Sequence, residues 1–141
     1  MDELSYYLSH TNCYKKSELE QILNKKIVIT RKHIENIDLK YHYHFDFNII
    51  KLFETYGYYF TNDDYILLVR MNGILIQCIS EDNITDEICK IAIQQNGCLL
   101  QCVPNDKKTD KICKIAVQKN EWALEYVPES PINGGFCKKP L

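Results

Sequence analysis

The stretch TDEICKIAIQQNG (Thr85–Gly97) returns after eleven residues as TDKICKIAVQKNE (Thr109–Glu121). Aligning the chain on these threonines and on Thr61 gives three repeats of 24 residues without insertions. The second and third repeats are identical at twelve positions. Repetition with a period of about 20–50 residues is typical of solenoids and other repeat arrays. The repeat therefore decides the fold class that the sequence predicts.

Each repeat predicts a helix, a turn, a short helix and a loop. Its first threonine is a good N-cap, because the hydroxyl can accept a hydrogen bond from an unpaired amide of the first turn. Ile88, Ile91 and Ala92 then form an apolar stripe with i, i+3, i+4 spacing. A second apolar run follows at Cys98–Val103 and is stopped by Pro104.

The first helix of each repeat carries signals at both ends. Thr61 and Asp64 have the spacing of a capping box. Residues 72–73 and 96–97 are Asn-Gly pairs, and glycine at a helix C-terminus readily takes a left-handed conformation. The third repeat has Glu121 at the position of that glycine. If the position needs a positive φ, glutamate costs about 1 kcal/mol there, and Glu121→Gly is predicted to stabilise the protein.

The predicted fold is mainly α: a short α-solenoid of about three 24-residue helix-turn-helix units over residues 61–130. One helical hairpin cannot bury its apolar face alone, whereas a stack of about three can. Each buried Leu or Ile side chain then contributes roughly 1.5–3 kcal/mol. A leucine-rich repeat has a similar period and would make residues 98–104 a strand. These residues do not alternate between apolar and polar as such a strand would, which favours the helical fold.

Residues 1–60 lack the repeat and are predicted to form a distinct N-terminal capping module. Ser17 and Glu20 have the spacing of a capping box that opens a helix. Residues 39–47 (LKYHYHFDF) alternate between apolar and polar, which predicts a strand, and residues 26–31 are its candidate partner. Residues 47–57 predict an amphipathic helix that ends at Gly57. The module is thus either helical or includes a small β-hairpin. Residues 131–141 are predicted to be an irregular tail.

Composition and charge argue against several classes of function. Apolar residues make up 45% of the chain, charged residues 26%, and the net charge is -2. This balance is typical of a globular protein. Nucleic-acid binding needs a basic surface and a membrane helix needs about eighteen consecutive apolar residues, and the sequence has neither. The N-terminus lacks a signal-peptide pattern, so we expect a cytoplasmic protein without nucleic-acid or membrane partners.

Most of the seven cysteines follow the repeat. Two repeat positions hold cysteine twice and tyrosine once: Cys89, Cys113 and Tyr65 share one, and Cys78, Cys102 and Tyr126 share the other. Exchange with tyrosine indicates positions that accept apolar bulk, as buried thiols do. We therefore interpret these cysteines as structural thiols rather than as disulfides or zinc ligands. Cys13 and Cys137 are expected to be the exposed ones.

The repeats also resemble a known group. AIQQNG (Ala92–Gly97) with LLQCVP (Leu99–Pro104), and AVQKN (Ala116–Asn120) with ALEYVPE (Ala123–Glu129), are similar to short helical repeats of unknown function that are abundant in giant DNA viruses of amoebae. The resemblance covers roughly residues 61–130 and does not reach the first sixty. It implies a helical repeat fold and a viral source. It implies no catalytic residues.

Three sets of side chains are candidates for an interaction site. The first shares one repeat position and forms either a ladder of amides or the ends of helices: Asn72, Asn96 and Asn120. The second shares a position on the second helix and lines either a groove or a solvated face: Gln77, Gln101 and Glu125. The third is aromatic, because interfaces favour Trp and Tyr, although each member could instead belong to the core: Trp122, Tyr126, Tyr58 and Tyr59.

A metal site has one weak pair of candidates. His42 and His44 lie on one face of the predicted strand, with Asp46 in line. Two such histidines can ligate a metal, but polar faces of strands commonly look like this. No local motif pairs a nucleophilic Cys or Ser with a base. We therefore expect no enzyme activity, no cofactor and no metal.

A repeat without catalytic motifs predicts a non-enzymatic protein–protein interaction module. On the family resemblance, the protein would be viral and would bind a host or viral protein in the host cytoplasm or in the virion. One alternative is a homo-oligomeric structural or virion component, because an open end of a solenoid exposes an apolar face. The other alternative is a small metal-dependent enzyme that uses His42 and His44.

Overall fold

The structure, a computed structural model, describes residues 1–11, 14–38 and 47–129. These residues are mainly helical, as the sequence predicts, and they contain no β-strand. The chain divides into two compact units, Met1–Leu67 and Leu68–Leu141, here called the N-terminal and C-terminal units. The boundary falls within the helix α5 (Asn62–Met71), which belongs to the first repeat.

The described part of the N-terminal unit consists of short helices before α5. They are α1 (Glu3–His10), α2 (Lys16–Leu23), α3 (Arg31–Glu35) and α4 (Ile49–Thr55). α1 packs against both α2 and α3. Every one of these helices contributes fully buried or nearly fully buried apolar side chains, among them Leu4, Leu8, Leu19, Ile34 and Phe53. The described part of the unit therefore builds its core mainly from helix side chains.

The start of α2 differs from the prediction. Its N-cap is Lys15, no side chain caps it, and Ser17 already lies inside the helix, so the capping box predicted at Ser17 and Glu20 is wrong. The Lys15 N–H instead donates to the Tyr7 hydroxyl oxygen at 3.0 Å. A tertiary contact from α1 thus replaces the local cap.

The predicted β-hairpin finds no support in its described half. Residues 26–31 contain a turn residue, irregular backbone and the first residue of α3. Lys26 has a φ of 60°, a left-handed conformation that interrupts an extended run. The predicted strand partner lies outside the described residues from position 39 to position 46.

α4 ends at a glycine, as the sequence predicts. Gly57 has a φ of 91°. Its N–H donates to the Glu54 carbonyl oxygen, and the Tyr58 N–H donates to the Phe53 carbonyl oxygen, both at 3.0 Å. This pair of bonds defines a Schellman motif, in which glycine takes the left-handed position without steric cost.

Asp64 joins three segments of the N-terminal unit. The predicted capping box is confirmed: the Thr61 N–H donates to Asp64 Oδ2 at 2.9 Å, and the Asp64 N–H donates to Thr61 Oγ1 at 3.3 Å. Arg31 Nη1 donates to Asp64 Oδ1 at 2.7 Å, and the Tyr58 hydroxyl donates to Asp64 Oδ2 at 2.9 Å. The Asp64 side chain is only 1% exposed, so these donors replace the hydrogen bonds to water that its carboxylate loses on burial.

A second polar cluster ties α1 to α3. His33 Nδ1 accepts a hydrogen bond from the Thr30 N–H at 2.9 Å, which leaves Nε2 as the donor to both Asp2 carboxylate oxygens at 3.1 Å. Asp2 also caps α1 by accepting from the Ser5 N–H at 2.8 Å. The Ser5 backbone bond, followed by the bond from His33, lowers the pKa of Asp2 to about 2 against the opposing effect of desolvation.

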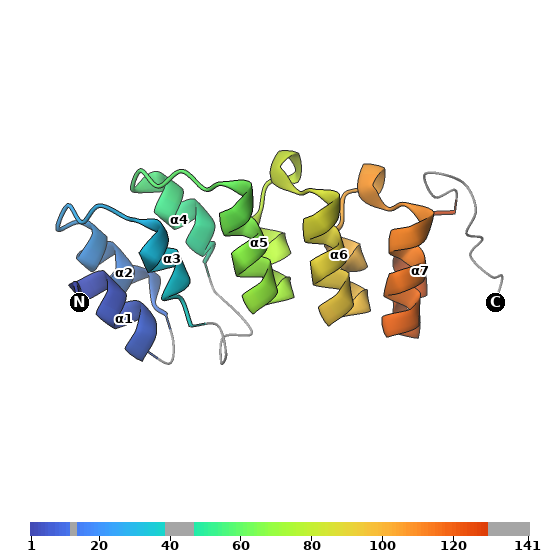
Figure 1. Cartoon of the computed structure of the whole chain (residues 1–141), viewed down its shortest axis with the longest axis horizontal. Coiled ribbons are helices and arrows are strands. Elements are labelled where there is room, and N and C mark those ends of the chain that lie inside the picture. The colour runs from blue at the N-terminus through green and yellow to red at the C-terminus, as the bar shows by residue number, and fades with distance from the viewer. Residues whose placement is uncertain (12–13, 39–46, 130–141) are drawn as a thin grey trace. The chain divides into compact units, whose positions relative to one another are not determined.

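The C-terminal unit alternates α-helices with 3₁₀ helices. Its elements after α5 are η1 (Gly73–Cys78), η2 (Glu81–Asn83), α6 (Asp86–Gln95), η3 (Gly97–Cys102), η4 (Asn105–Lys107), α7 (Asp110–Lys119) and η5 (Glu121–Tyr126). α6 lies beside α7 (Figure 1), and η3 packs beside η5. The predicted order of helix, turn, short helix and loop is confirmed, with a 3₁₀ geometry for the second helix. The strand interpretation of residues 98–104 is therefore wrong.

The boundaries of α6 and α7 follow the sequence. Thr85 Oγ1 accepts from the Ile88 N–H and Thr109 Oγ1 accepts from the Ile112 N–H, each at 3.3 Å. The buried face of α6 is shifted slightly from the predicted stripe, since Ile93 is fully buried and Ile91 only half-buried.

Gly97 is required by a close approach and not by a positive φ. Within the described residues, positive φ values occur at Lys26 and Gly57, so the left-handed conformation predicted for the Asn-Gly pairs is wrong. A Cβ on Gly97 would overlap the carbonyl group of Ala116 in the third repeat. At Gly73 the nearest backbone atom to such a Cβ is the Ala92 carbonyl oxygen, at 3.3 Å. Glycine thus lets each following α-helix press against the start of a 3₁₀ helix.

Gly97→Ala is expected to lower the free energy of unfolding by about 2–3 kcal/mol, because the added methyl group forces the second and third repeats apart.

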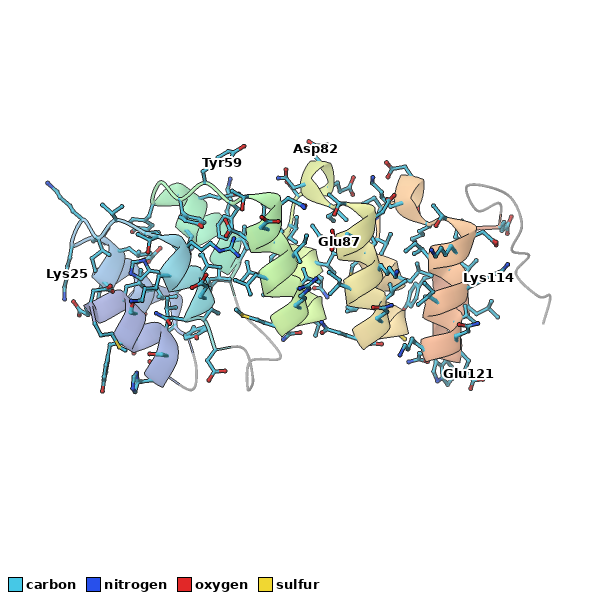
Figure 2. All side chains as sticks on the ribbon, viewed as in Figure 1. Lys25, Tyr59, Asp82, Glu87, Lys114 and Glu121 are labelled. Carbon is cyan, nitrogen blue, oxygen red and sulfur yellow. The ribbon has the colours of Figure 1, made fainter. Side chains whose placement is uncertain are left out.

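Glu121→Gly changes the same repeat position where the side chain is exposed (Figure 2). It is expected to lower stability by about 0.5–1 kcal/mol through the added freedom of the unfolded chain, which reverses the gain predicted from the sequence. Urea denaturation measures both. Equal losses in the two variants would contradict the close-approach explanation.

Asp2→Asn is expected to destabilise the protein at pH 7 by about 0.5–1 kcal/mol, a small effect because the carboxylate is half-exposed and screened by solvent. The folded pKa of about 2 lies below the ordinary value of 3.8. The stabilisation is therefore complete above about pH 4 and lost as the pH falls through 2. Urea denaturation between pH 2 and pH 7 measures the difference, with the exposed Asp82→Asn (Figure 2) as control. If Asp2→Asn lost the same free energy of unfolding at pH 2 as at pH 7, the ionised Asp2 carboxylate would not be the cause of the loss.

Candidate functional site

The second helix of each repeat carries a polar residue at the same repeat position, and this residue faces solvent. Gln77 on η1, Gln101 on η3 and Glu125 on η5 are all exposed. η1 packs beside η3, and η3 beside η5, so equivalent positions follow one another along the stack. These three residues are called the amide row below, although its third member is a carboxylate.

A hollow of about 460 Å³ opens beside the amide row, at the junction of the first and second repeats. Its lining combines three isoleucines with two amides, one carboxylate and one thiol: Ile76, Ile79, Ile84, Gln77, Gln101, Glu81 and Cys102. We call it the first-junction hollow. Sequence reasoning found the two glutamines but not the hollow, because Glu81 and Ile84 lie in the loop region where the repeats diverge.

The three repeated asparagines act on the backbone. Asn96 ends α6 and begins η3, with an extended φ of -150°. Its Oδ1 accepts from the Cys98 N–H at 3.0 Å. The same bond recurs in the other repeats, where Asn72 accepts from Ile74 at 3.1 Å and Asn120 from Trp122 at 3.0 Å. Helix termination and capping account for all three asparagines, and their role in binding remains a prediction.

The side chain of Gln95 links two repeats and was missed from the sequence. Its Nε2 donates to the Val69 carbonyl oxygen at 2.7 Å and to that of Arg70 at 3.2 Å, and its Oε1 accepts from the Gly73 N–H at 2.7 Å. The last carbonyl groups of an α-helix lack partners within it, so Gln95 supplies them for α5. The third repeat has Lys119 at this position, and the alignment therefore gave no signal.

The aromatic candidates divide into two kinds. Trp122 is 72% exposed, and Tyr59, which points away from the ribbon in Figure 2, is 86% exposed. Tyr126 and Tyr58 are half-buried, and the hydroxyl of Tyr58 is bound to Asp64. Burial together with the hydrogen bond to Asp64 raises the pKa of Tyr58 to about 12. Of the four candidates, Trp122 and Tyr59 are thus the two whose side chains are most accessible to a partner.

The metal candidates His42 and His44, together with Asp46, lie outside the described residues. In the part of the chain that the structure describes, no group of three or more His, Cys, Asp or Glu side chains could hold a metal ion. None of the described helices is both long enough and apolar enough to cross a membrane.

Part of the C-terminal unit matches a known family. Residues 85–130, which hold most of the second and third repeats, match the family described as "Domain of unknown function (DUF4116)". Neither the curated proteins nor the solved structures contain a match. The comparisons therefore assign these residues no activity.

The repeat cysteines are free thiols packed in the stack. Cys89 and Cys113 are fully buried, and Cys78, Cys98 and Cys102 are half-buried. Burial, followed by the nearby Asp86 carboxylate, raises the pKa of Cys89 to about 11. Burial also raises the pKa of Cys113. Full burial of Cys89 and Cys113 agrees with their interpretation as structural thiols, Cys78 and Cys102 are only half-buried, and Cys13 and Cys137 lie outside the described residues.

Alkylation of the native protein with iodoacetamide is expected to modify Cys98 well before Cys89 and Cys113. Only the thiolate reacts, and a pKa of about 11 in place of 9 reduces the thiolate fraction of Cys89 about a hundredfold, before burial slows access further. Peptide mapping by mass spectrometry measures the rates, and the same reaction in urea provides the control, in which the differences should vanish. Rapid modification of Cys89 in the native protein would contradict this expectation and show that the packing around Cys89 opens.

Proposed function

We propose that this protein is a non-enzymatic protein–protein interaction module whose partner binds along the second helices of the repeats. The observation that carries the proposal is the exposed amide row beside the first-junction hollow. Stacked repeats present the same chemistry at regular intervals, which lets one partner segment touch several repeats at once. The hollow adds a concave site where a side chain of the partner can be enclosed.

The amide row suits an extended polypeptide. A glutamine side chain offers both a hydrogen-bond donor and an acceptor, as a peptide group does. An extended partner segment has backbone N–H and C=O groups without partners of their own, and Gln77 and Gln101 can satisfy them. The likeness of the repeats to those of giant DNA viruses supports a partner from an amoebal host or from the virus itself. It equally supports a location in the host cytoplasm or the virion.

A homo-oligomer built by end-to-end stacking is disfavoured by one residue. The third repeat does carry apolar surface, since Val117 and Leu124 are half-buried whereas their counterparts Ile93 and Leu100 are fully buried. A second copy stacked in repeat fashion would nevertheless have to bring a helix backbone against Glu121, where the preceding junction has a glycine. Binding of a partner at the amide row does not require a helix backbone to approach Glu121.

The triple variant Gln77→Ala, Gln101→Ala, Glu125→Ala is expected to lose at least about tenfold in affinity for its partner, because several hydrogen bonds are removed together. The matched control changes three exposed residues at one repeat position on the α-helices: Arg70→Ala, Gln94→Ala and Gln118→Ala. Partners are captured from lysate of amoebal cells, infected and uninfected, and the binding of each is then measured with purified components. A partner retained equally by both triple variants would contradict the proposed binding face.

A further inference from the structure

Two successive repeat junctions in the C-terminal unit can be compared position by position. The first-junction hollow lies between η1 and η3, and each residue that lines it has a counterpart 24 residues later at the junction of η3 and η5. The counterparts of the lining residues are Leu100, Gln101, Val103, Asn105, Lys108, Glu125 and Tyr126. The chemistry that fills the second junction therefore indicates what the first can accept.

The second junction contains a buried lysine of the chain itself. Lys108 is only 8% exposed, and its Nζ donates to the Tyr126 carbonyl oxygen at 3.2 Å. Its aliphatic stem lies in the junction while its ammonium group meets the end of a 3₁₀ helix, where carbonyl groups attract a cation. Lysine is seldom buried without a partner, so this position is built to accept an ammonium group.

The first junction is formed by residues at the same repeat positions but has no lysine at the position of Lys108. Ile84 stands at the position of Lys108 and ends in methyl groups, and Cys102 stands at the position of Tyr126. Glu81 replaces Asn105, which adds a negative charge to the wall of the hollow. None of the residues that line the hollow is basic. The first junction therefore offers a carboxylate, two amides and the open volume of the hollow, whereas the second junction holds a buried ammonium group of the chain itself.

We propose that the first-junction hollow binds a lysine side chain of the partner protein. The partner's methylene chain lies against Ile76, Ile79 and Ile84, and its ammonium group lies between Glu81 and the carbonyl oxygen of Cys102, as that of Lys108 does beside Tyr126. An ammonium on a flexible four-carbon stem fits this geometry better than the planar fork of arginine. The proposal rests on the proposed function and names the side chain that anchors the partner on that face.

The site can be probed without the partner by n-butylammonium chloride, which reproduces the end of a lysine side chain. Titration is followed by ¹H–¹⁵N NMR of the full chain, with butan-1-ol as the neutral control and n-propylguanidinium as the arginine analogue. We expect shifts at residues 76–84 and 101–102, with a dissociation constant on the order of millimolar for so small a ligand. Butanol should bind at least about tenfold more weakly and the guanidinium should bind more weakly than the ammonium.

Variants separate the charge from the shape of the hollow. Glu81→Gln is expected to weaken n-butylammonium binding about fivefold, the size typical of one partly exposed charge pair, whereas Asp82→Asn next to it should leave binding unchanged. Ile84→Lys should fill the first junction as Lys108 fills the second and abolish binding. Lys108→Ala should open a corresponding hollow at the second junction, and n-butylammonium should then raise its melting temperature more than that of the unmodified protein.

Absence of local shifts, equal binding of butanol, or an unchanged affinity in Glu81→Gln would overturn the lysine site and leave the partner-capture experiment standing on its own. Conversely, n-butylammonium could bind at the hollow while a captured partner binds the amide-row triple variant as well as the unmodified protein. That result would overturn the proposed function alone. With a partner in hand, Ile84→Lys and Glu81→Gln should each weaken capture, and replacement of the contacting lysine of the partner by methionine should do the same. Full capture by Ile84→Lys would show that no partner side chain enters the hollow.

Discussion

The packing of the repeats depends on how closely two backbones approach at Gly97. Only hydrogen at this position lets the Ala116 carbonyl group of the next repeat come into contact, and the surrounding isoleucines and leucines then close around both helices. The 3₁₀ geometry of the second helices is compatible with this approach, because a 3₁₀ helix is narrower than an α-helix. Between the second and third repeats, a backbone contact thus takes the place that side-chain contacts hold in most helix pairs.

The polar bonds between repeats follow from the same proximity. Gln95 reaches the carbonyl groups at the end of α5 from α6, which packs against the following helix η1. Asn96 turns the chain from α6 into η3 within one residue, which sets the short distance between the two helices of a repeat. Each bond satisfies backbone groups that helix ends leave without partners. The stack is therefore held by apolar burial and aligned by a few specific amides.

Local signals in the sequence were sufficient to predict the features that depend on residues a few positions apart. The N-caps at Thr85 and Thr109, the capping box at Thr61 and the stop at Gly57 depend on neighbours within a few residues, and the structure has all of them. The helix start at Ser17 and the role of Gly97 were misjudged because each depends on a residue far along the chain, Tyr7 and Ala116 respectively. The amide row could be found from the repeat register, whereas the hollow beside it requires knowledge of what two adjacent repeats enclose.

Glu121 also gives the array a direction in which it can grow. A copied 24-residue segment inserted before this residue would meet glycines on its neighbours, as the second and third repeats do. A copy added after it would place a helix backbone against a charged side chain. Gene duplication within this stretch is therefore tolerated in the interior of the array and penalised beyond the third repeat, so relatives with more repeats should carry glycine at every internal position equivalent to 121.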